Sequence, residues 1–374
     1  MRVIGAPELS IVVCTYERPR NLSACLASIA RQEGVRGRFE VVVADDGSRD
    51  ATPRLVEEFR RAAGFPVLFT TREHDGFRPA RCRNDGARAC RGESLLFVDG
   101  DCVLPPGHVR AHLDRRREGV VQGGDCLRLT EEQSEALVGS GGAVAPPRSA
   151  LFAERWRVTR NHLDARLNGL LRNPQKPKLF AGDFSLGRRD LERVNGFDER
   201  YRDWGGEDDD LRARLLQAGL EVRSLRDATC SFHRWHPPDA TAPKRWTEGR
   251  NVPRLKRRFR LTRCVDGLSR RRMEDLSIRV RNAARHGAAV AAAFPFLAAP
   301  APDGGRVEVE GLFLPGPEGF TGDVDVRLLV LGDRVTRPPL DQADVLVTDL
   351  PDVRFDGRPR FRTDELPRVW EAIL

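Results

Sequence analysis

The stretch LSIVVCTYERP, residues 9–19, decides the fold of this chain. Its first seven residues are almost uniformly apolar, which is typical of a buried strand. Pro19 then precedes a segment with apolar residues at helical spacing, namely Leu22, Cys25, Leu26 and Ile29. The pattern recurs at once, with Phe39–Ala44 as a second strand and Pro53 opening a second helix. The sequence therefore predicts a βαβ unit.

Two further apolar runs, Val67–Thr70 and Ser94–Val98, extend this pattern. Unbroken apolar strands that alternate with helices indicate a mostly parallel sheet with helices on both faces, so the expected fold class is α/β and Rossmann-like. Ligands of such sheets bind beyond the carboxyl ends of the strands. Five polar residues are expected at that edge: Thr15, Asp45, Asp46, Asp99 and Asp101.

The remainder of the chain is less regular. Residues 110–178 are charged and mostly helical in pattern, whereas Leu211, Leu215 and Leu216 predict a helix that Gly219 ends. We expect a main domain over 1–264, a basic linker over 265–300 with a helix at Met273–Phe294, and a small α+β domain over 301–374. The last would contain the strands Val307–Phe313, Val324–Leu331 and Val345–Leu350 and the helix Leu366–Leu374.

Composition excludes several classes of protein. The 374 residues carry 63 Lys+Arg against 55 Asp+Glu, and a hydrophobic share of 40% excludes general disorder. The eight cysteines form no Cys-x-x-Cys pair and fit small core residues better than a disulfide scaffold, as expected in a reducing cytoplasm. No signal-like N-terminus and no apolar run of about 18 residues is present, so a cytoplasmic protein is expected.

Asp99-Gly100-Asp101 follows an apolar strand directly. Two carboxylates around a glycine hold a hard divalent ion well, and the glycine would let a diphosphate approach the backbone. In isolation, such a motif is more often a solvated turn. A second acidic turn at the same sheet edge favours the metal.

The string DWGGEDDD, residues 203–210, is the most distinctive in the chain. Acidic residues at a helix N-terminus can simply complement the helix dipole. Two glycines behind a tryptophan instead indicate a backbone that bends closely around a ligand. A carboxylate there would accept a proton from an attacking hydroxyl.

Residues 232–236, FHRWH, contain the most closely spaced histidine pair. Histidines are more often structural than ligating, but this pair follows the acidic helix and predicts a further metal ligand. His74 is a further candidate for lining the site. Four histidines are expected to be structural: His108, His112, His162 and His286. In the loop of residues 75–86, arginines at a helix N-terminus would either pair with a diphosphate or form a solvated basic face.

These motifs together resemble family 2 glycosyltransferases of the GT-A fold. The resemblance rests on the run 11–19, on Asp45-Asp46-Gly47-Ser48, on Asp99-Gly100-Asp101 and on three loops at 75–86, 182–185 and 194–199. Residues 204–211 further resemble the galactosyltransferase-type half of β-1,4-galactosyltransferases and chondroitin-polymerase modules. The resemblance covers residues 8–240, and residues 265–374 resemble nothing known to us.

The resemblance implies a role for individual residues. Thr15, Glu17 and Asp45 would line the nucleotide base and ribose, and Asp99 would contact the ribose or the metal. Asp101 would coordinate Mn²⁺ or Mg²⁺, completed by His233 or, second, His236. Asp208 would be the general base, with Glu207 positioning the acceptor. Donor contacts would also come from Arg81 and from Asp183, where many relatives carry Asn.

The expected function is an inverting, metal-dependent transfer of a hexose, N-acetylhexosamine or glucuronate from a UDP-sugar to a glycan or lipid-linked acceptor. The alternative is a non-catalytic nucleotide- or carbohydrate-binding subunit of a glycan-assembly complex. The arginine-rich segment 244–272 has only two aromatic residues, which disfavours nucleic-acid binding. Its apolar residues Val252, Leu255, Phe259 and Leu261 would instead give peripheral contact with an anionic membrane or an acidic glycan.

Overall fold

The structure is a computed structural model of the chain. It describes residues 6–139, 146–170, 178–257 and 260–271, and near the C-terminus residues 278–282, 308–311, 326–331, 345–348, 360–362 and 365. The chain divides into two compact units, Met1–Leu255 and Lys256–Leu374. The division therefore precedes the expected one after residue 264.

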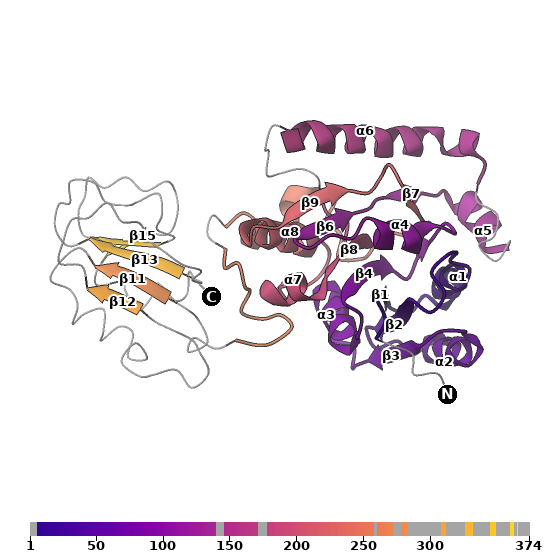
Figure 1. Cartoon of the computed structure of the whole chain (residues 1–374), viewed down its shortest axis with the longest axis horizontal. Coiled ribbons are helices and arrows are strands. Elements are labelled where there is room, and N and C mark those ends of the chain that lie inside the picture. Colours follow the sequence, from indigo (N-terminus) through magenta and orange to yellow (C-terminus); the bar gives the residue numbers. More distant parts are fainter. Residues whose placement is uncertain are drawn as a thin grey trace. The chain divides into compact units, whose positions relative to one another are not determined.

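The first unit is built on a seven-stranded sheet in the order β3-β2-β1-β4-β8-β6-β9 (Figure 1). Only β8 runs antiparallel to its neighbours, so the sheet is mostly parallel. The strands are β1 (Leu9–Thr15), β2 (Phe39–Asp45), β3 (Val67–Thr71), β4 (Ser94–Asp99), β6 (Val120–Gly123), β8 (Asp183–Gly187) and β9 (Glu221–Ser224). The predicted α/β class with a mostly parallel sheet is confirmed.

Helices lie on both faces of this sheet. The helices in the described part of this unit are α1 (Pro19–Ala30), α2 (Thr52–Ala62), α3 (Pro79–Ala89), α4 (His108–Asp114), α5 (Glu131–Gly139), α6 (Phe152–Leu170), α7 (Arg188–Arg193), α8 (Glu207–Gln217) and α9 (Val252–Leu255). Two short 3₁₀ helices, η1 (Arg148–Leu151) and η2 (Trp246–Glu248), complete the unit. As predicted, α8 ends just before Gly219, whose φ of +83° suits glycine.

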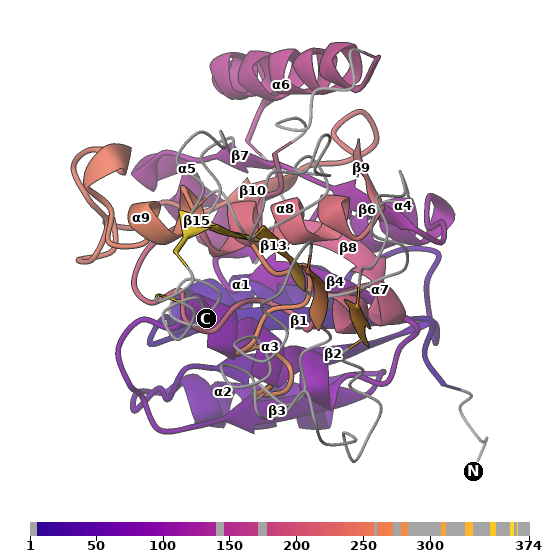
Figure 2. The same cartoon turned by 90° about the vertical axis from the view of Figure 1, so that its left-hand side faces the viewer.

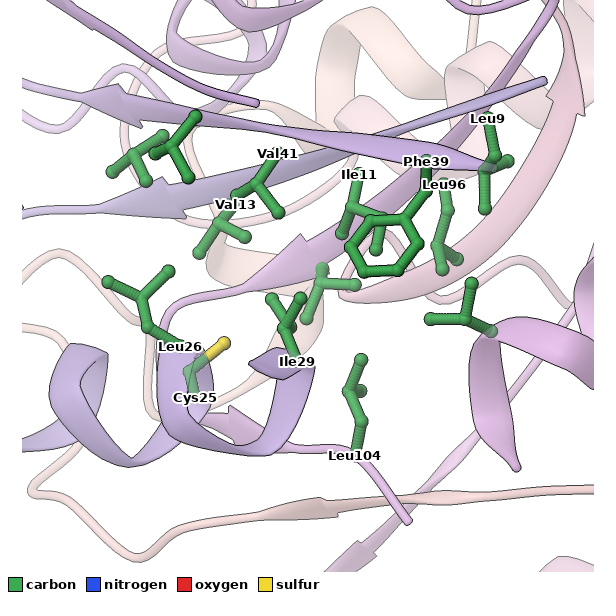
Figure 3. Packing of buried hydrophobic residues seen from close by; sticks show 14 of the residues in the cluster. Leu9, Ile11, Val13, Cys25, Leu26, Ile29, Phe39, Val41, Leu96 and Leu104 are labelled. Carbon is green, nitrogen blue, oxygen red and sulfur yellow. The ribbon is translucent and has the colours of Figure 1, made fainter. Parts of the chain in front are cut away.

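The two faces of β1 pack against different helices because side chains alternate along a strand. Ile11 and Val13 face α1, where Leu26 and Ile29 are completely buried with them (Figure 3). Val12 faces α3, and a Cβ on Gly86 would lie only 2.4 Å from its Cγ1. The close approach of α3 to the sheet thus requires glycine at 86.

A smaller sheet, in the order β5-β10-β7, lies beside the carboxyl end of β4. It consists of β5 (Cys102–Val103), β7 (Cys126–Arg128) and β10 (Ser231–His233). His233 pairs with Cys102 across the β5–β10 ladder. Because of this pairing, residues 231–233 lie next to residues 102–103, which follow β4 in the sequence.

The sequence predicted the first four strands within two residues of their observed ends, but its helical interpretation of residues 110–178 was incomplete. That segment also contains the strands β6 and β7. Both have only three or four residues, too few for a period to show.

The second unit contains a five-stranded sheet in the order β12-β11-β13-β14-β15. Its strands are β11 (Ile278–Asn282), β12 (Glu308–Gly311), β13 (Val326–Leu331), β14 (Val345–Thr348) and β15 (Arg360–Phe361), all paired in parallel. β11 lies inside the linking helix expected at Met273–Phe294, so that prediction was wrong. Alternation of Ile278, Val280 and the arginines between them fits a strand better. The α+β class of this unit stays a prediction, and the closing helix at Leu366–Leu374 lies outside the described residues.

Two further predictions have outcomes in the structure. All eight cysteines are free, as expected for a fold without a disulfide framework. Val252 and Leu261 are only 4% exposed, so they cannot form the apolar contact expected of the arginine-rich segment, and Phe259 lies outside the described residues. No helix within the described part of the chain is long and apolar enough to cross a membrane.

Candidate active site

The carboxyl ends of β2, β1 and β4 lie side by side, as the sequence predicted. Thr15 pairs with Asp45, and Cys14 pairs with Asp99. The backbone N–H of Gly100 donates a hydrogen bond to the carbonyl of Cys14 at 2.7 Å. A Cβ at position 100 would lie 2.8 Å from that same carbonyl oxygen. Gly100 is therefore required by the approach of β1, and the diphosphate contact expected for it stays a prediction.

Asp101, His233 and His236 form a compact group of potential metal ligands. His236 Nε2 lies 3.2 Å from Asp101 Oδ2, and His233 Nε2 lies 3.6 Å from Asp101 Oδ1. When an ion is bound at about 2.1 Å from each ligand atom, neighbouring ligand atoms lie about 3 Å apart. The distances between these ligand atoms are therefore close to those of a metal site. The Nδ1 of His236 lies 2.7 Å from the carbonyl of Pro237, a contact that orients the ring toward Asp101.

The electrostatics of this group favour a charged carboxylate. Burial opposes ionisation of Asp101, but the hydrogen bond with His236 and the nearby His233 and Arg18 hold its pKa well below the usual range. The contact with Asp101 also raises the pKa of His236. An ionised carboxylate beside two imidazoles is a donor set that suits Mn²⁺ and similar borderline cations.

Arg83 links the strand end to the acidic turn. Its Nη2 donates to Asp99 Oδ1 at 2.8 Å, and its Nη1 donates to Glu207 Oε1 at 3.1 Å. The side chain is buried, and the neighbouring Asp99 and Glu207 more than offset the cost of burial, so the pKa of Arg83 is raised. One guanidinium group therefore holds Asp99 and the N-terminus of α8 within a few ångströms of each other.

The acidic turn owes its shape to positive backbone φ angles. Gly205 and Gly206 have φ of +87° and +96°, and Gly206 is the left-handed N-cap residue of α8. Asn251 donates hydrogen bonds to the carbonyls of Arg202 and Gly205, both at 2.7 Å. The turn is thus held from outside by Asn251, which presents Glu207 and Asp208 at the start of α8.

Glu207 and Asp208 differ in their surroundings. Glu207 is buried, and its Oε2 has no hydrogen-bond partner among the described residues. Asp208 is half-buried, and burial together with the charges of Glu207 and Asp209 raises its pKa to about 8. A carboxyl group that titrates near neutral pH is suited to accept a proton.

The residues expected at the nucleotide base lie around the ends of β1 and β2. Asp45 is buried and accepts hydrogen bonds from the Ser48 N–H at 2.9 Å and the Thr71 hydroxyl at 2.7 Å. Glu17 is exposed, and its N–H donates to Ser48 Oγ at 2.8 Å. The rings of Tyr16 and His74 stack with centroids 4.2 Å apart beside this turn. Asp45 thus shapes the turn, whereas Glu17 remains open to a ligand.

Asp183 lies elsewhere. Its side chain is fully buried, with His108 Nε2 and His112 Nε2 each 3.2 Å from Oδ1 and Ser231 Oγ donating to Oδ2 at 3.0 Å. The spacing of this group also suits a metal, but hydrogen bonds satisfy both carboxylate oxygens without one. Asp183 is a buried structural residue, and none of its atoms is exposed for contact with a donor. The sequence had predicted such a donor contact.

Two of the expected positions are occupied by neighbouring residues. Arg81 is half-exposed and lies 3.7 Å from Glu199, so Arg83 takes the position at the strand edge that was expected for it. Asp99 pairs with Arg83 and is not in the group of potential metal ligands, where His236 joins Asp101 and His233. Sequence reasoning also missed Arg18, whose Nη1 lies 3.1 Å from Asp101 Oδ2. Its position just before Pro19 at the start of α1 was the available signal.

Replacing Arg83 by Met should lower the free energy of unfolding by about 3 kcal/mol, because it leaves the carboxylates of Asp99 and Glu207 without their shared partner. Urea denaturation measures this. Arg81→Met is the matched control on the same helix, and its loosely paired side chain should contribute less than about 1 kcal/mol. Equal stabilities of the two variants would contradict the bridging role of Arg83.

Comparison with known proteins gives a consistent result. Residues 10–127 match the model of Glycosyl transferase family 2, and residues 161–236 match the model described as the N-terminal domain of galactosyltransferase. Validoxylamine A glucosyltransferase of Streptomyces hygroscopicus subsp. jinggangensis is 31% identical, over 59% of this chain and 54% of that protein. Chondroitin synthase of Escherichia coli is 26% identical, over 65% of this chain and 37% of that protein.

Among solved structures, a Staphylococcus aureus TarS structure covering 1–349 is similar with a TM-score of 0.43 and 19% identity, over 61% of this chain and 60% of that one. The chain thus spans about half the length of the glucosyltransferase and less of the synthase. The segment at 161–236 supplies β8, β9 and β10, which complete the two sheets around the site. The chain therefore matches Glycosyl transferase family 2 over residues 10–127 and a galactosyltransferase-type model over residues 161–236, and both segments contribute strands to one α/β unit with a mostly parallel sheet.

Proposed function

We propose that this protein is an inverting, metal-dependent glycosyltransferase. It moves a hexose, N-acetylhexosamine or glucuronate from a UDP-sugar to a hydroxyl group of a glycan or lipid-linked acceptor. The observation that carries the proposal is the double contact of Arg83 with Asp99 and Glu207. Asp99 ends β4 and is followed closely by the metal-ligand residue Asp101. Glu207 lies in the acidic turn beside the proposed proton acceptor, Asp208. The contact of Arg83 therefore joins the two halves of the site.

Asp101, His233 and His236 are the residues that would hold a divalent cation. A cation bound there would neutralise the charge that develops on the departing diphosphate. Arg18 lies against Asp101 and is partly exposed, so its guanidinium is placed to pair with the same phosphates. Mn²⁺ suits the donor set better than Mg²⁺, because two of the three ligands are imidazoles.

Asp208 accepts the proton of the acceptor hydroxyl as that oxygen attacks the anomeric carbon. A single displacement inverts the configuration of that carbon, because the hydroxyl attacks from the side opposite the diphosphate. The unpartnered Oε2 of Glu207 can accept a hydrogen bond from a second hydroxyl of the acceptor. Asp208 thus serves as the base, and Glu207 orients the acceptor.

Two tryptophans beside the acidic turn supply a surface for the acceptor. Trp204 and Trp246 are each 42% exposed, and their rings meet edge to face with centroids 6.0 Å apart. A Cβ at Gly205 would lie 3.1 Å from the Trp246 ring, so the glycine allows this packing. Trp246→Ala should raise the KM for the acceptor several-fold while the KM for the donor stays unchanged, as steady-state kinetics would show. A rise in the KM for the donor alone would place Trp246 at the donor instead.

The pH dependence of the reaction follows from the raised pKa of Asp208. The base acts only when it is ionised, so kcat/KM should rise with pH and level off above about 8. A pH series with the full chain at saturating Mn²⁺ measures this. A profile that is flat between pH 6 and 9, or that falls over this range, would contradict the assignment of Asp208 as the base.

The alternative is a binding subunit that retains the fold without turnover. The two functions differ in the fate of the donor, because an active enzyme hydrolyses its sugar nucleotide slowly even without an acceptor. The full chain should therefore be incubated with a panel of UDP-, GDP- and dTDP-linked sugars and Mn²⁺. Release of UDP from one or a few UDP-sugars supports the transferase, whereas binding without release favours the subunit.

A further inference from the structure

The outward face of α6 carries large apolar side chains that no other described residue covers. Phe152 is 74% exposed, Trp156 61%, Leu163 55% and Leu167 57%. Their spacings of four, seven and four residues place all four on one stripe of the helix. Contiguous exposed apolar surface of this kind marks an interaction site, since single exposed residues do not align in this way.

The opposite face of α6 fixes the helix to the first unit. Val158 is buried in a cluster with Leu151 and Leu127. His162 Nδ1 lies 3.0 Å from Ser224 Oγ, and Arg157 Nη2 donates to the carbonyl of Cys126 at 2.6 Å. Figures 1 and 2 show α6 along the outside of this unit in both views. The apolar stripe is therefore held pointing away from the core.

Arginines flank the stripe, and no acidic residue of the described part of α6 is exposed. Arg155 and Arg166 lie on one side of the apolar stripe, and Arg160 lies on the other. None of the three forms an ion pair with another residue in the described part of the chain. Of the acids on this helix, Glu154 and Asp164 are both partly buried, and Glu154 is paired with Arg157. The exposed face thus combines apolar bulk with net positive charge.

We propose that α6 lies on an anionic lipid surface. Trp156, Phe152 and the two leucines would enter the boundary between headgroups and acyl chains, and the three arginines would contact lipid phosphates. The helix spans about 28 Å along its axis, so the stripe can lie flat in the plane of the interface. A second copy of this chain fits less well, because two such faces would oppose their arginines.

This proposal is independent of the transfer chemistry, since lipid binding requires neither donor nor base. The test is co-sedimentation of the full chain with vesicles of phosphatidylglycerol and phosphatidylcholine in equal parts, and with phosphatidylcholine alone. We expect binding to the anionic vesicles at low salt and about ten-fold weaker binding in a few hundred millimolar NaCl. Trp156→Ser/Leu163→Ser should weaken binding at least about ten-fold, because it removes apolar area from the interface.

A charge variant and its control complete the test. Arg155→Glu/Arg166→Glu should abolish binding to the anionic vesicles, whereas Arg31→Glu/Arg36→Glu, with two exposed arginines elsewhere in the first unit, should leave it unchanged. Circular dichroism checks that each variant is folded. Failure of the wild type to bind, or equal loss in the control variant, would overturn the proposal. A wild-type dimer that the Trp156→Ser/Leu163→Ser variant converts to a monomer, without vesicle binding, would assign the stripe to a second copy instead.

Discussion

Replacing Asp208 by Asn should lower turnover by about 100-fold or more while the affinity for the UDP-sugar changes by a few-fold at most. The amide keeps the size of the side chain and one acceptor oxygen but cannot take up a proton, and loss of a general base typically has this scale. The proposed donor contacts lie at the ends of β1, β2 and β4, which the substitution does not touch. Steady-state turnover and calorimetric titration of the donor measure the two effects separately.

Asp209→Asn is the matched control for this experiment. Asp209 is the next residue on α8 and is also half-buried, but Asp208 is the group that titrates near neutral pH. Asp209→Asn should lower the pKa of Asp208, because Asp209 contributes to raising it, and should leave turnover within a few-fold. If Asp208→Asn retains activity and Asp209→Asn loses it, the base is Asp209. Activity in both variants would favour Glu207 or a simple helix cap.

Replacing Asp101 by Ala should abolish the part of the UDP affinity that depends on a divalent ion. UDP should bind the wild type weakly without metal and at least about ten-fold more tightly with Mn²⁺, since the cation offsets charge between the carboxylate and the diphosphate. Asp101 is the residue that both histidines face, so its loss removes the centre of the group. Calorimetric titration of UDP with and without Mn²⁺ measures the difference.

Single histidine variants separate the two imidazole ligands. His233→Ala and His236→Ala should each weaken the Mn²⁺-dependent affinity by about 10- to 100-fold, the usual scale for impairing a metal site. His162→Ala is a suitable control, because His162 contacts Ser224 and is not a member of the group of potential metal ligands. Equal UDP affinity of the wild type with and without Mn²⁺ would contradict the metal site.

The βαβ part of the fold was predictable because its signal is local. A buried parallel strand shows in the sequence as a short unbroken apolar run, and β1, β2 and β4 each contain such a run of four residues. The strands β5 and β10 have two and three residues, and they are strands only because β10 pairs with β5 on one side and with β7 on the other. No local pattern announces such pairing. The position of the carboxylates at the strand ends was therefore predictable from the sequence. The β5–β10 pairing that brings His233 close to them was not.

Helix register explains the error at Arg81. Residues 81 and 83 are separated by about 200° around a helix, so only one can face the strand end. The sequence of the loop does not fix which one, because the start of α3 sets the rotation. Arg83 is buried with Asp99 and Glu207, whereas Arg81 lies toward Glu199. Asp183 was misplaced for a similar reason, since a motif match does not indicate whether a side chain is exposed or buried.

The central claim is that Asp101 and Asp208 act in one metal-dependent transfer reaction. The most direct test is the initial rate of UDP release from a hydrolysed UDP-sugar in the presence of Mn²⁺, measured side by side for the wild type, Asp101→Ala and Asp208→Asn. We predict release by the wild type that stops when EDTA is added, and rates at least about 100-fold lower in both variants. Release that persists in EDTA, or that proceeds at the wild-type rate in either variant, would contradict the claim.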